Sequence, residues 1–189
     1  MKKLLSLFTV AACAAFVAGC GTTSNLKTPE GADIRSLQKY SNVSVLDFGN
    51  QTGKKTDMTP EQVQELGRQF ADKIALELQD TKVFEKVTRT TTPEPGSLLV
   101  TGNITRCTEG SPGLRLWIGM GAGSSYFDAT VEFADADTTQ KLGDILVDKN
   151  SWGLGGGAAA AQTVEHFMQA AARKVAAQIA KAKTASAGK

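Results

Sequence analysis

The sequence predicts an α/β (α+β) fold in which a mixed β-sheet has two long amphipathic helices packed on one face. Three observations predict it. Apolar residues recur every three or four positions over residues 60–80 and 158–183, as in helices that cover a core. Strand-like segments follow one another from residue 98 to residue 152, which favours hairpins. A strand, a helix and a second strand over residues 43–87 favour one parallel crossover.

The chain opens with a signal-like segment. Two lysines precede an apolar run from Leu4 to Ala18, and Gly19 and Cys20 follow it. The run is short for a transmembrane helix, which needs about 20 residues. The segment resembles the lipobox that ends the signal peptide of bacterial lipoproteins. This resemblance implies loss of residues 1–19, a diacylglyceryl thioether on Cys20, and acylation of the new amino terminus with a fatty acid such as palmitate.

The lipobox sets the expected location and the first partner. We expect the acylated Cys20 to anchor the protein in a lipid bilayer, because several acyl chains together bind durably where one is marginal. In enterobacteria-like sorting an Asp after the cysteine retains a lipoprotein in the inner membrane, and Gly21 stands there. The sequence therefore predicts an outer-membrane lipoprotein that faces the periplasm of the cell envelope. Residues 20–39 are polar and aperiodic, which predicts a flexible tether.

The remaining chain has the length of one domain, which we place at residues 40–183, with a flexible tail at 184–189. Loss of Lys2 and Lys3 leaves as many basic as acidic residues, so charge gives no case for nucleic acid as a partner. Cys107 is then the only other cysteine, which excludes an intrachain disulfide and a multi-cysteine zinc site. We expect a half-buried apolar Cys107; an intermolecular disulfide and a reactive thiol are the alternatives.

The first strand and the first helix are predicted from local signals. Residues 43–48 are rich in β-branched and apolar residues and stop at a Gly-Asn turn. Thr59 is a helix N-cap, Pro60 suits the first helical position, and Gln62 completes a capping box. The helix that follows has a stripe of apolar residues for the core: Val63, Leu66, Phe70, Ile74 and Leu78.

The later elements follow in order. Residues 83–87 form a short strand, and a Pro-rich and Gly-rich segment breaks the chain before the strand at 98–107. Residues 126–134 alternate as a second long strand, and a turn leads into the strand at 142–152. The strand at 98–107 places Leu98, Val100, Gly102 and Ile104 on one face, and the last helix has the stripe Val164, Phe167 or Met168, Ala171, Val175 and Ile179.

Candidate chemistry is sparse, and we expect no cofactor, no metal and no enzymatic activity. His166 is the only histidine, and we expect it partly exposed on a helix. Asp135 and Asp137 could share a cation, but in a turn their carboxylates more often bind their own backbone. The loop Gly153–Gly157 follows a strand and precedes a helix, as in a dinucleotide fingerprint, but no second strand with an acidic end follows. Its alternative role is close packing of the backbone.

Two patterns resemble known families. The pattern Val43-x-Val45-Leu46-Asp47-Phe48-x-Asn50-x-Thr52, before a helix and Val83-Phe84-x-x-Val87, is similar to periplasmic domains of the penicillin-binding-protein activator lipoproteins, the curli secretion lipoprotein and the Tol-Pal translocation protein. The pattern Val100-x-Gly102-x-Ile104-x-Arg106, followed by Arg115, Gly119 and Gly121-Ala-Gly123-Ser124, resembles the uncharacterised bacterial lipoprotein family called domain of unknown function 4410. The resemblance implies an α/β domain with a mixed sheet and no catalytic residue.

Two functions remain open at this point. The first is a non-enzymatic binding or assembly module that binds an envelope protein or a second copy of itself. The second is a small-ligand or nucleotide-binding protein, or an enzyme, that uses the loop 153–157. Residues 114–133 could also insert into a membrane after oligomerisation, although glycines interrupt the alternation. Large apolar side chains beside glycines favour an exposed interface, for which the candidates are Trp117, Ile118, Met120 and Tyr126. Ordinary core packing is the alternative role of these four residues.

Overall fold

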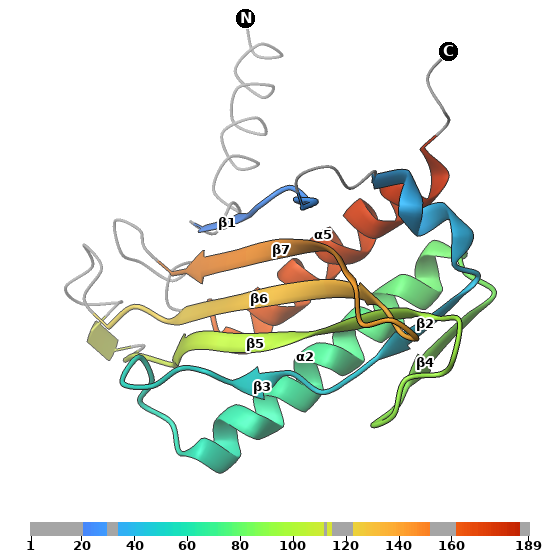
Figure 1. Cartoon of the computed structure of the whole chain (residues 1–189). Helices are drawn as coiled ribbons and strands as arrows, with labels where there is room; N and C mark the ends of the chain where they lie inside the picture. Colours follow the sequence, from blue (N-terminus) through green and yellow to red (C-terminus); the bar gives the residue numbers. More distant parts are fainter. Residues whose placement is uncertain (1–20, 30–33, 112, 115–122, 152–161, 186–189) are drawn as a thin grey trace, which may run out of the picture.

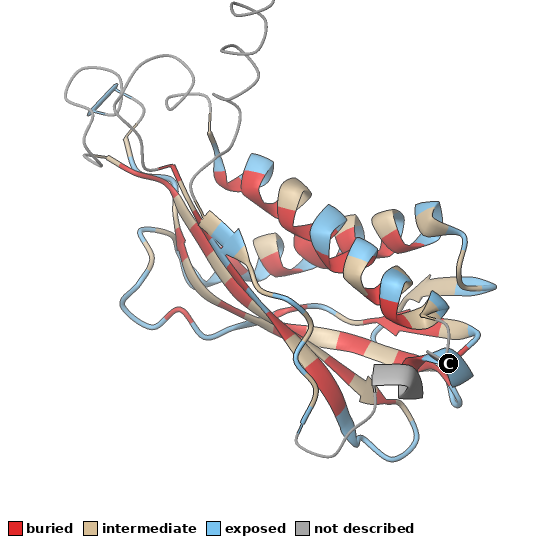
Figure 2. Ribbon diagram, turned by 90° about the horizontal axis from the view of Figure 1, so that it is seen from above, coloured by how far each residue is buried: buried red, intermediate tan, exposed pale blue. Residues whose placement is uncertain are grey.

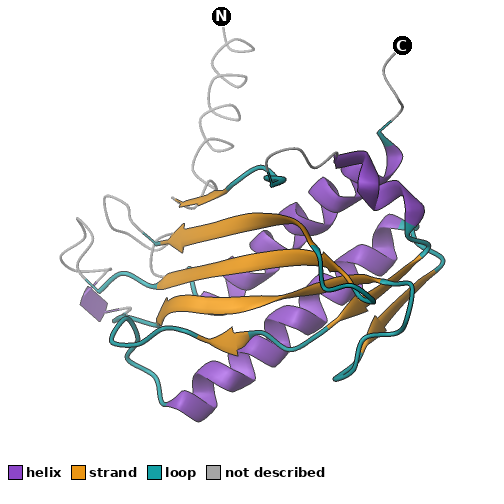
Figure 3. Cartoon of the chain, in the orientation of Figure 1, coloured by secondary structure: helices purple, strands orange, loops and turns teal. Residues whose placement is uncertain are grey.

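The computed structural model describes residues 21–29, 34–111, 113–114, 123–151 and 162–185. One seven-stranded mixed sheet has two long helices on one face, which confirms the predicted fold class (Figure 1). Helices and sheet form two layers, and both α2 and α5 lie on the same face of the sheet, so that neither covers the other face (Figure 3). The elements are β1 (Gly21–Thr23), the 3-10 helix η2 (Ile34–Lys39), β2 (Asn42–Val45), β3 (Gly49–Asn50), α2 (Pro60–Thr81), β4 (Lys86–Arg89), β5 (Leu98–Thr108), β6 (Tyr126–Asp135), β7 (Lys141–Asn150) and α5 (Val164–Thr184).

The strand order combines the crossover and the hairpins that the sequence predicts. The order across the sheet is β1-β7-β6-β5-β2-β4, and β3 pairs with β5 beside this path. The strand β2 is parallel to both of its neighbours, β4 and β5, and α2 makes the crossover from β2 to β4. The strands β5, β6, β7 and β1 pair in antiparallel fashion.

The helix α2 begins as the sequence predicts. The hydroxyl of Thr59 accepts a hydrogen bond from the backbone N–H of Gln62 at 3.3 Å, and the Gln62 side chain accepts one from the Thr59 N–H at 2.8 Å. These two bonds satisfy two N–H groups that a helix start leaves unpaired. The helix ends where Lys82 adopts a left-handed conformation with φ of 56°. Its buried face is formed by Val63, Gly67, Phe70, Ala71, Ile74, Ala75 and Leu78.

The core lies between the helices and the covered face of the sheet (Figure 2). In β5 and β6 buried residues alternate with partly exposed ones, as predicted. Phe70 of α2 packs edge-on against Phe48 and against Phe127 of β6, with ring centroids 4.9 Å and 5.0 Å apart. Edge-to-face pairs contribute about 0.5 to 1.5 kcal/mol beyond the burial of their area. This aromatic cluster joins the β2–β3 connection, the helix and the sheet.

The segment expected to be a flexible tether differs from that expectation where it is described. Gly21–Thr23 forms the edge strand β1 and pairs with β7, and Lys27 makes an isolated bridge to Asp144. The amide of Gln178 in α5 donates a hydrogen bond to the Ser24 carbonyl at 2.7 Å. Backbone pairing, which carries no hydrophobic periodicity, holds this polar segment to the sheet. The ordered part of the domain therefore includes residues before Tyr40.

Several element ends also differ from the prediction. The strand β2 ends at Val45, because the chain then turns Phe48 under α2. The strand β4 begins at Lys86, three residues after the predicted start. The helix α5 begins at Val164 rather than at residue 158, since the Thr163 hydroxyl caps it by accepting from the His166 N–H at 3.2 Å. Residues 158–161 lie outside the described residues.

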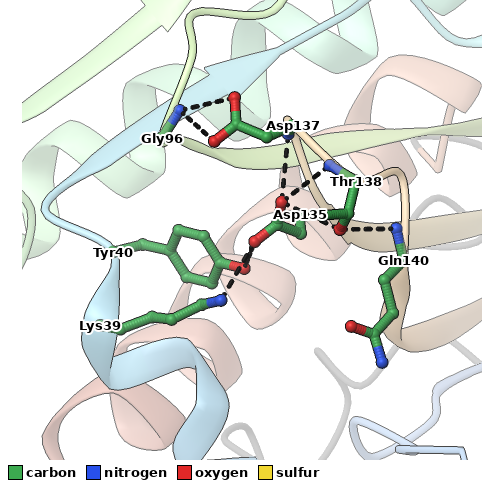
Figure 4. A network of polar contacts seen from close by, with 7 residues as sticks. All are labelled: Lys39, Tyr40, Gly96, Asp135, Asp137, Thr138 and Gln140. Atoms are coloured by element: carbon green, nitrogen blue, oxygen red, sulfur yellow. Dashed lines mark hydrogen bonds and ion pairs between the residues drawn. The ribbon is translucent and has the colours of Figure 1, made fainter.

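Asp135 closes the β6–β7 hairpin and confirms the predicted aspartate turn (Figure 4). One of its carboxylate oxygens accepts hydrogen bonds from the Asp137 N–H at 3.1 Å and from the Thr138 N–H at 3.0 Å. The other accepts from the Tyr40 hydroxyl at 2.6 Å and from the Lys39 ammonium at 3.1 Å. The Tyr40 hydroxyl, followed by the Thr138 N–H and Lys39, holds the pKa of Asp135 well below its usual range. Asp135 therefore ties the hairpin to the start of the domain.

The substitution Gly67→Ala tests the close approach of α2 to the β2–β3 connection. A Cβ at Gly67 would lie 2.2 Å from the carbonyl oxygen of Phe48. In a helix interior, alanine normally stabilises by about 1 kcal/mol relative to glycine. Here we expect Gly67→Ala to lower the free energy of unfolding by about 1 to 3 kcal/mol, measured by urea denaturation.

Gln64→Ala is the matched control, because it places alanine at an exposed position of the same helix. Its free energy of unfolding should stay within about 0.5 kcal/mol of the wild-type value. A Gly67→Ala protein as stable as the wild type would show that the helix can withdraw from Phe48 without cost.

Candidate functional site

A β-bulge turns Arg106 to the open face of the sheet. Along β5 the residues up to Ile104 alternate, with Ile104 facing the helices. The register against β6 shifts between Ile104 and Arg106, so that Arg106 pairs with Asp128 and the next residue, Cys107, is buried. Without the shift, strict alternation would place Arg106 on the covered face. Bulges often re-aim a side chain beside a functional site.

Arg106 lies over the ring of Tyr126, the first residue of β6. The guanidinium carbon is 3.3 Å from the ring centroid, in cation–π contact. Within the described part of the chain, the guanidinium makes no hydrogen bond or ion pair. The contact fixes the plane of the group and leaves its N–H donors for a ligand.

Asp128 is the most perturbed acid near Arg106. It lies directly opposite Asp148 in the antiparallel β6–β7 pair. Burial, and secondly the Asp148 charge, raise the pKa of Asp128 to about 6, although Arg106, a hydrogen bond from the Lys149 backbone and Lys55 oppose the shift. Its Oδ1 atom is shielded from solvent and has no hydrogen-bond partner among the described residues. A buried carboxylate oxygen without a hydrogen-bond donor is destabilising, so this arrangement lowers the free energy of unfolding of the protein.

The loop between β3 and α2 forms the second wall of the site. The backbone carbonyl of Lys55 accepts a hydrogen bond from the Cys107 N–H at 3.2 Å. The Thr56 hydroxyl lies 3.3 Å from the Cys107 sulfur, and the Asp57 carboxylate accepts from the N–H of Glu109 at 3.3 Å. These contacts hold the loop against the end of β5. Burial raises the pKa of the Cys107 thiol, which keeps it protonated.

A cavity of about 420 Å³ opens between this loop and the sheet. Ligand sites in proteins are of similar size, roughly 300 to 1,000 Å³. Cationic groups and carboxylates share its walls, which suits the binding of polar groups. We call it the Arg106 pocket, and the described residues that line it are Lys54, Lys55, Thr56, Asp57, Arg106, Thr108 and Asp128.

The sequence-based candidates are only partly placed by the structure. Tyr126 is half-buried under Arg106 and forms one side of this region. Three other candidates, Trp117, Ile118 and Met120, lie outside the described residues, as do Cys20 and the loop 153–157. His166 is exposed on α5, as predicted, and Cys107 is fully buried rather than half-buried.

Sequence reasoning missed the residues of the Arg106 pocket. Arg106 stood in the family-like pattern without a role, and Asp128 was one outward residue of an alternating strand. The sequence feature that could have indicated them is the pair of opposite charges, Arg106 and Asp128, near the ends of two neighbouring predicted strands, where bulges are common. Lys54 and Lys55 had no such signal, because loop lysines are usually solvated.

Comparison with known proteins gives the family. The model of the family described as "Domain of unknown function (DUF4410)" matches residues 27–155, which is more than half of the chain. The chain belongs to this family. The DUF4410 match includes all of the described residues that line the Arg106 pocket. No curated protein matches the chain.

Two solved structures resemble this DUF4410 protein in fold. One is the dodecamer of a leucine-to-methionine variant of PelC from Paraburkholderia phytofirmans, with a TM-score of 0.55 and 16% identity over 84% of this chain and 96% of that chain. The other is the PelC dodecamer from the same organism in another crystal form, with a TM-score of 0.54 and 12% identity over the same shares of both chains. At these identities the likeness shows the fold alone.

Asp128→Asn tests whether the Arg106 pocket costs stability. A raised carboxyl pKa means that the folded state binds the proton more tightly than the unfolded state, whose Asp titrates near 4. Stability therefore falls as pH rises from about 4 to about 6, and the loss persists above that range. We expect Asp128→Asn to raise the free energy of unfolding at pH 7 by about 1 to 3 kcal/mol.

The measurement is urea denaturation at several pH values between 4 and 8. The Asp148→Asn protein is the comparison: its gain should be smaller, because Asp148 is the second cause of the shift after burial. An Asp128→Asn protein whose stability follows the wild-type pH profile would contradict the raised pKa.

Proposed function

We propose that the mature chain is a membrane-anchored, periplasm-facing lipoprotein that acts as a non-enzymatic binding or assembly module of the cell envelope. The observation that carries the proposal is the lipobox-like segment that ends in Cys20, directly before the strand β1. Acylation of Cys20 would place the sheet at a membrane surface. Among the described residues, neither α2 nor α5 is long and apolar enough to cross a membrane.

Self-association is the form of assembly that the fold favours. Both of the similar solved structures are described as dodecamers of a chain with this fold. A repeated head-to-tail contact between identical chains closes into a ring when its rotation allows. Neither α2 nor α5 covers the open face of the sheet (Figure 3), and we place the contact at Trp117, Ile118, Met120 and Tyr126.

The chemistry of the described residues supports binding rather than catalysis. Cys107 is buried with a raised thiol pKa, which disfavours the nucleophilic thiolate. His166 lies exposed on α5, on the layer opposite to the Arg106 pocket. A nucleophile and a base within hydrogen-bonding reach are the minimum for covalent catalysis.

Membrane fractionation tests the anchor and its sorting. We expect the wild-type protein in the outer-membrane fraction and Cys20→Ala in neither membrane fraction. Gly21→Asp should move the protein to the inner membrane. Because a Cβ at residue 21 would lie 2.6 Å from the Asp148 carbonyl oxygen, Gly21→Ala is the matched control for the strain on β1. Wild-type protein that is soluble in the periplasm would end the lipoprotein proposal.

Native mass spectrometry of the detergent-solubilised protein tests assembly. We expect the wild type to form a closed oligomer, and Trp117→Ala to shift it toward the monomer by at least about tenfold in dissociation constant, as for a buried aromatic anchor. Leu76→Ala is the control, because Leu76 is an exposed apolar residue on α2, with 56% of its area accessible. A wild-type protein that is monomeric and binds no envelope protein contradicts this part of the proposal.

A further inference from the structure

We propose that the Arg106 pocket binds a hydroxylated organic anion of the acidic-sugar class, with the carboxylate at the cationic groups and a neighbouring hydroxyl at Asp128. This ligand site goes beyond the proposed function, since it requires neither the lipid anchor nor self-association. Within the described part of the chain, its lining comes from the loop before α2 and from the strands β5 and β6.

Three cationic groups define the anion end of the pocket. Arg106 lies flat on Tyr126 with its N–H donors unused by the described residues. Lys54 and Lys55 line the same cavity from the loop before α2, and within the described chain their ammonium groups form no ion pair. Asp57 is engaged with the N–H groups of Glu109 and Gly110, so it is directed to the loop rather than to these cations. A carboxylate would find a planar guanidinium and two ammonium donors together.

Two oxygen atoms of the lining require a different group. The Oδ1 atom of Asp128 and the Oγ1 atom of Thr108 are both shielded from solvent and lack hydrogen-bond partners among the described residues. Asp128 needs a donor, and the Thr108 hydroxyl can donate or accept. One sugar hydroxyl can donate to Asp128, and another can pair with Thr108. These are hydrogen bonds that the described residues do not supply.

The mixed lining also excludes simpler ligands. A bare anion without a hydroxyl would bring its charge toward Asp128 and leave both oxygens without partners. A zwitterion could place its ammonium group at Asp128, but it would add a further positive charge to a pocket that already holds three cationic groups. A neutral sugar would leave the three cations unpaired. A ligand with one carboxylate and adjacent hydroxyls satisfies all of these groups, and a uronate is such a molecule.

The geometry of the pocket permits this ligand. A volume of about 420 Å³ accommodates a monosaccharide acid. Backbone hydrogen bonds from Cys107 to Lys55 and from Gln51 to Ile104 hold the wall in place. Asp128 Oδ1 and Thr108 Oγ1 are shielded from solvent, so a ligand reaches them only when a neighbouring side chain moves, and Lys54 and Lys55 are exposed side chains of the lining.

Isothermal titration calorimetry of the purified full chain in detergent tests the proposal. The probes are D-glucuronate, D-glucose, acetate and glycine, at pH 7.5 and low salt. We expect saturable binding of glucuronate and an affinity for each of the other three probes that is at least about tenfold lower. A tenfold loss corresponds to the loss of about one hydrogen bond to a charged group. No binding of glucuronate, or equal binding of acetate or of glycine, would overturn the proposal.

Three variants identify the site. Arg106→Gln should weaken glucuronate binding by at least about tenfold, and Lys55→Gln by about fivefold, because each removes a charged donor. Thr108→Val is nearly isosteric and removes a hydroxyl that has no partner among the described residues, so it should weaken binding about fivefold without lowering Tm. Lys181→Gln makes the same charge change on α5 and should leave the affinity within about twofold.

Full affinity in Arg106→Gln and Thr108→Val would place the ligand elsewhere and refute the assignment. The outcome is separable from the proposed function. Trp117→Ala should dissociate the oligomer and keep glucuronate binding, whereas Arg106→Gln should lose binding and keep the membrane location.

Discussion

The placement of Phe48 is the constraint on which the rest of the fold depends. Its carbonyl oxygen approaches α2 so closely that only glycine fits at residue 67. On the sheet side, a Cβ at Gly102 would lie 2.7 Å from the Phe48 ring and 1.9 Å from the Thr130 carbonyl oxygen. Gly67 in the helix layer and Gly102 in the sheet layer have no side chain, and the space this leaves is occupied by the Phe48 ring and backbone. The helix, the sheet and the loop that follows Phe48 are thereby positioned together, and that loop is one wall of the Arg106 pocket.

The two faces of the sheet contribute differently to the stability of the fold. The covered face is mostly apolar, with Lys149 of β7 as a buried exception, and it provides the burial that stabilises a domain of this size. The open face concentrates the groups that cost stability: a desolvated carboxylate opposite a second one, and a threonine hydroxyl without a partner among the described residues. Functional sites commonly keep such unfavourable groups because ligands or partners satisfy them. The bulge in β5 permits the separation, since it moves one charged residue out of the core.

Sequence patterns predicted the parts of this structure that depend on periodicity. The stripe from Val63 to Leu78 and the alternation in β5 and β6 follow from burial on one side, so both helices and the mixed sheet could be inferred. Backbone pairing leaves no such trace, so the sequence predicts a tether where residues 21–23 form an edge strand. The bulge at Arg106 and the contact of Arg106 with Tyr126 depend on register, which a single sequence does not reveal. The pocket could not be predicted for the same reason, because its loop and its strands meet only in three dimensions.

The early pairing of β1 has a mechanical consequence. Gly21 is joined to residue 20 by one peptide bond and is already paired with Lys149 of β7. Leu26 and Ser24 are further hydrogen-bonded to Gln178 of α5, so strand and helix both hold this segment. A force applied at residue 20 therefore loads the edge of the sheet directly, without a stretch of unpaired chain between them. Whatever holds that residue also limits how far the sheet can move away from it.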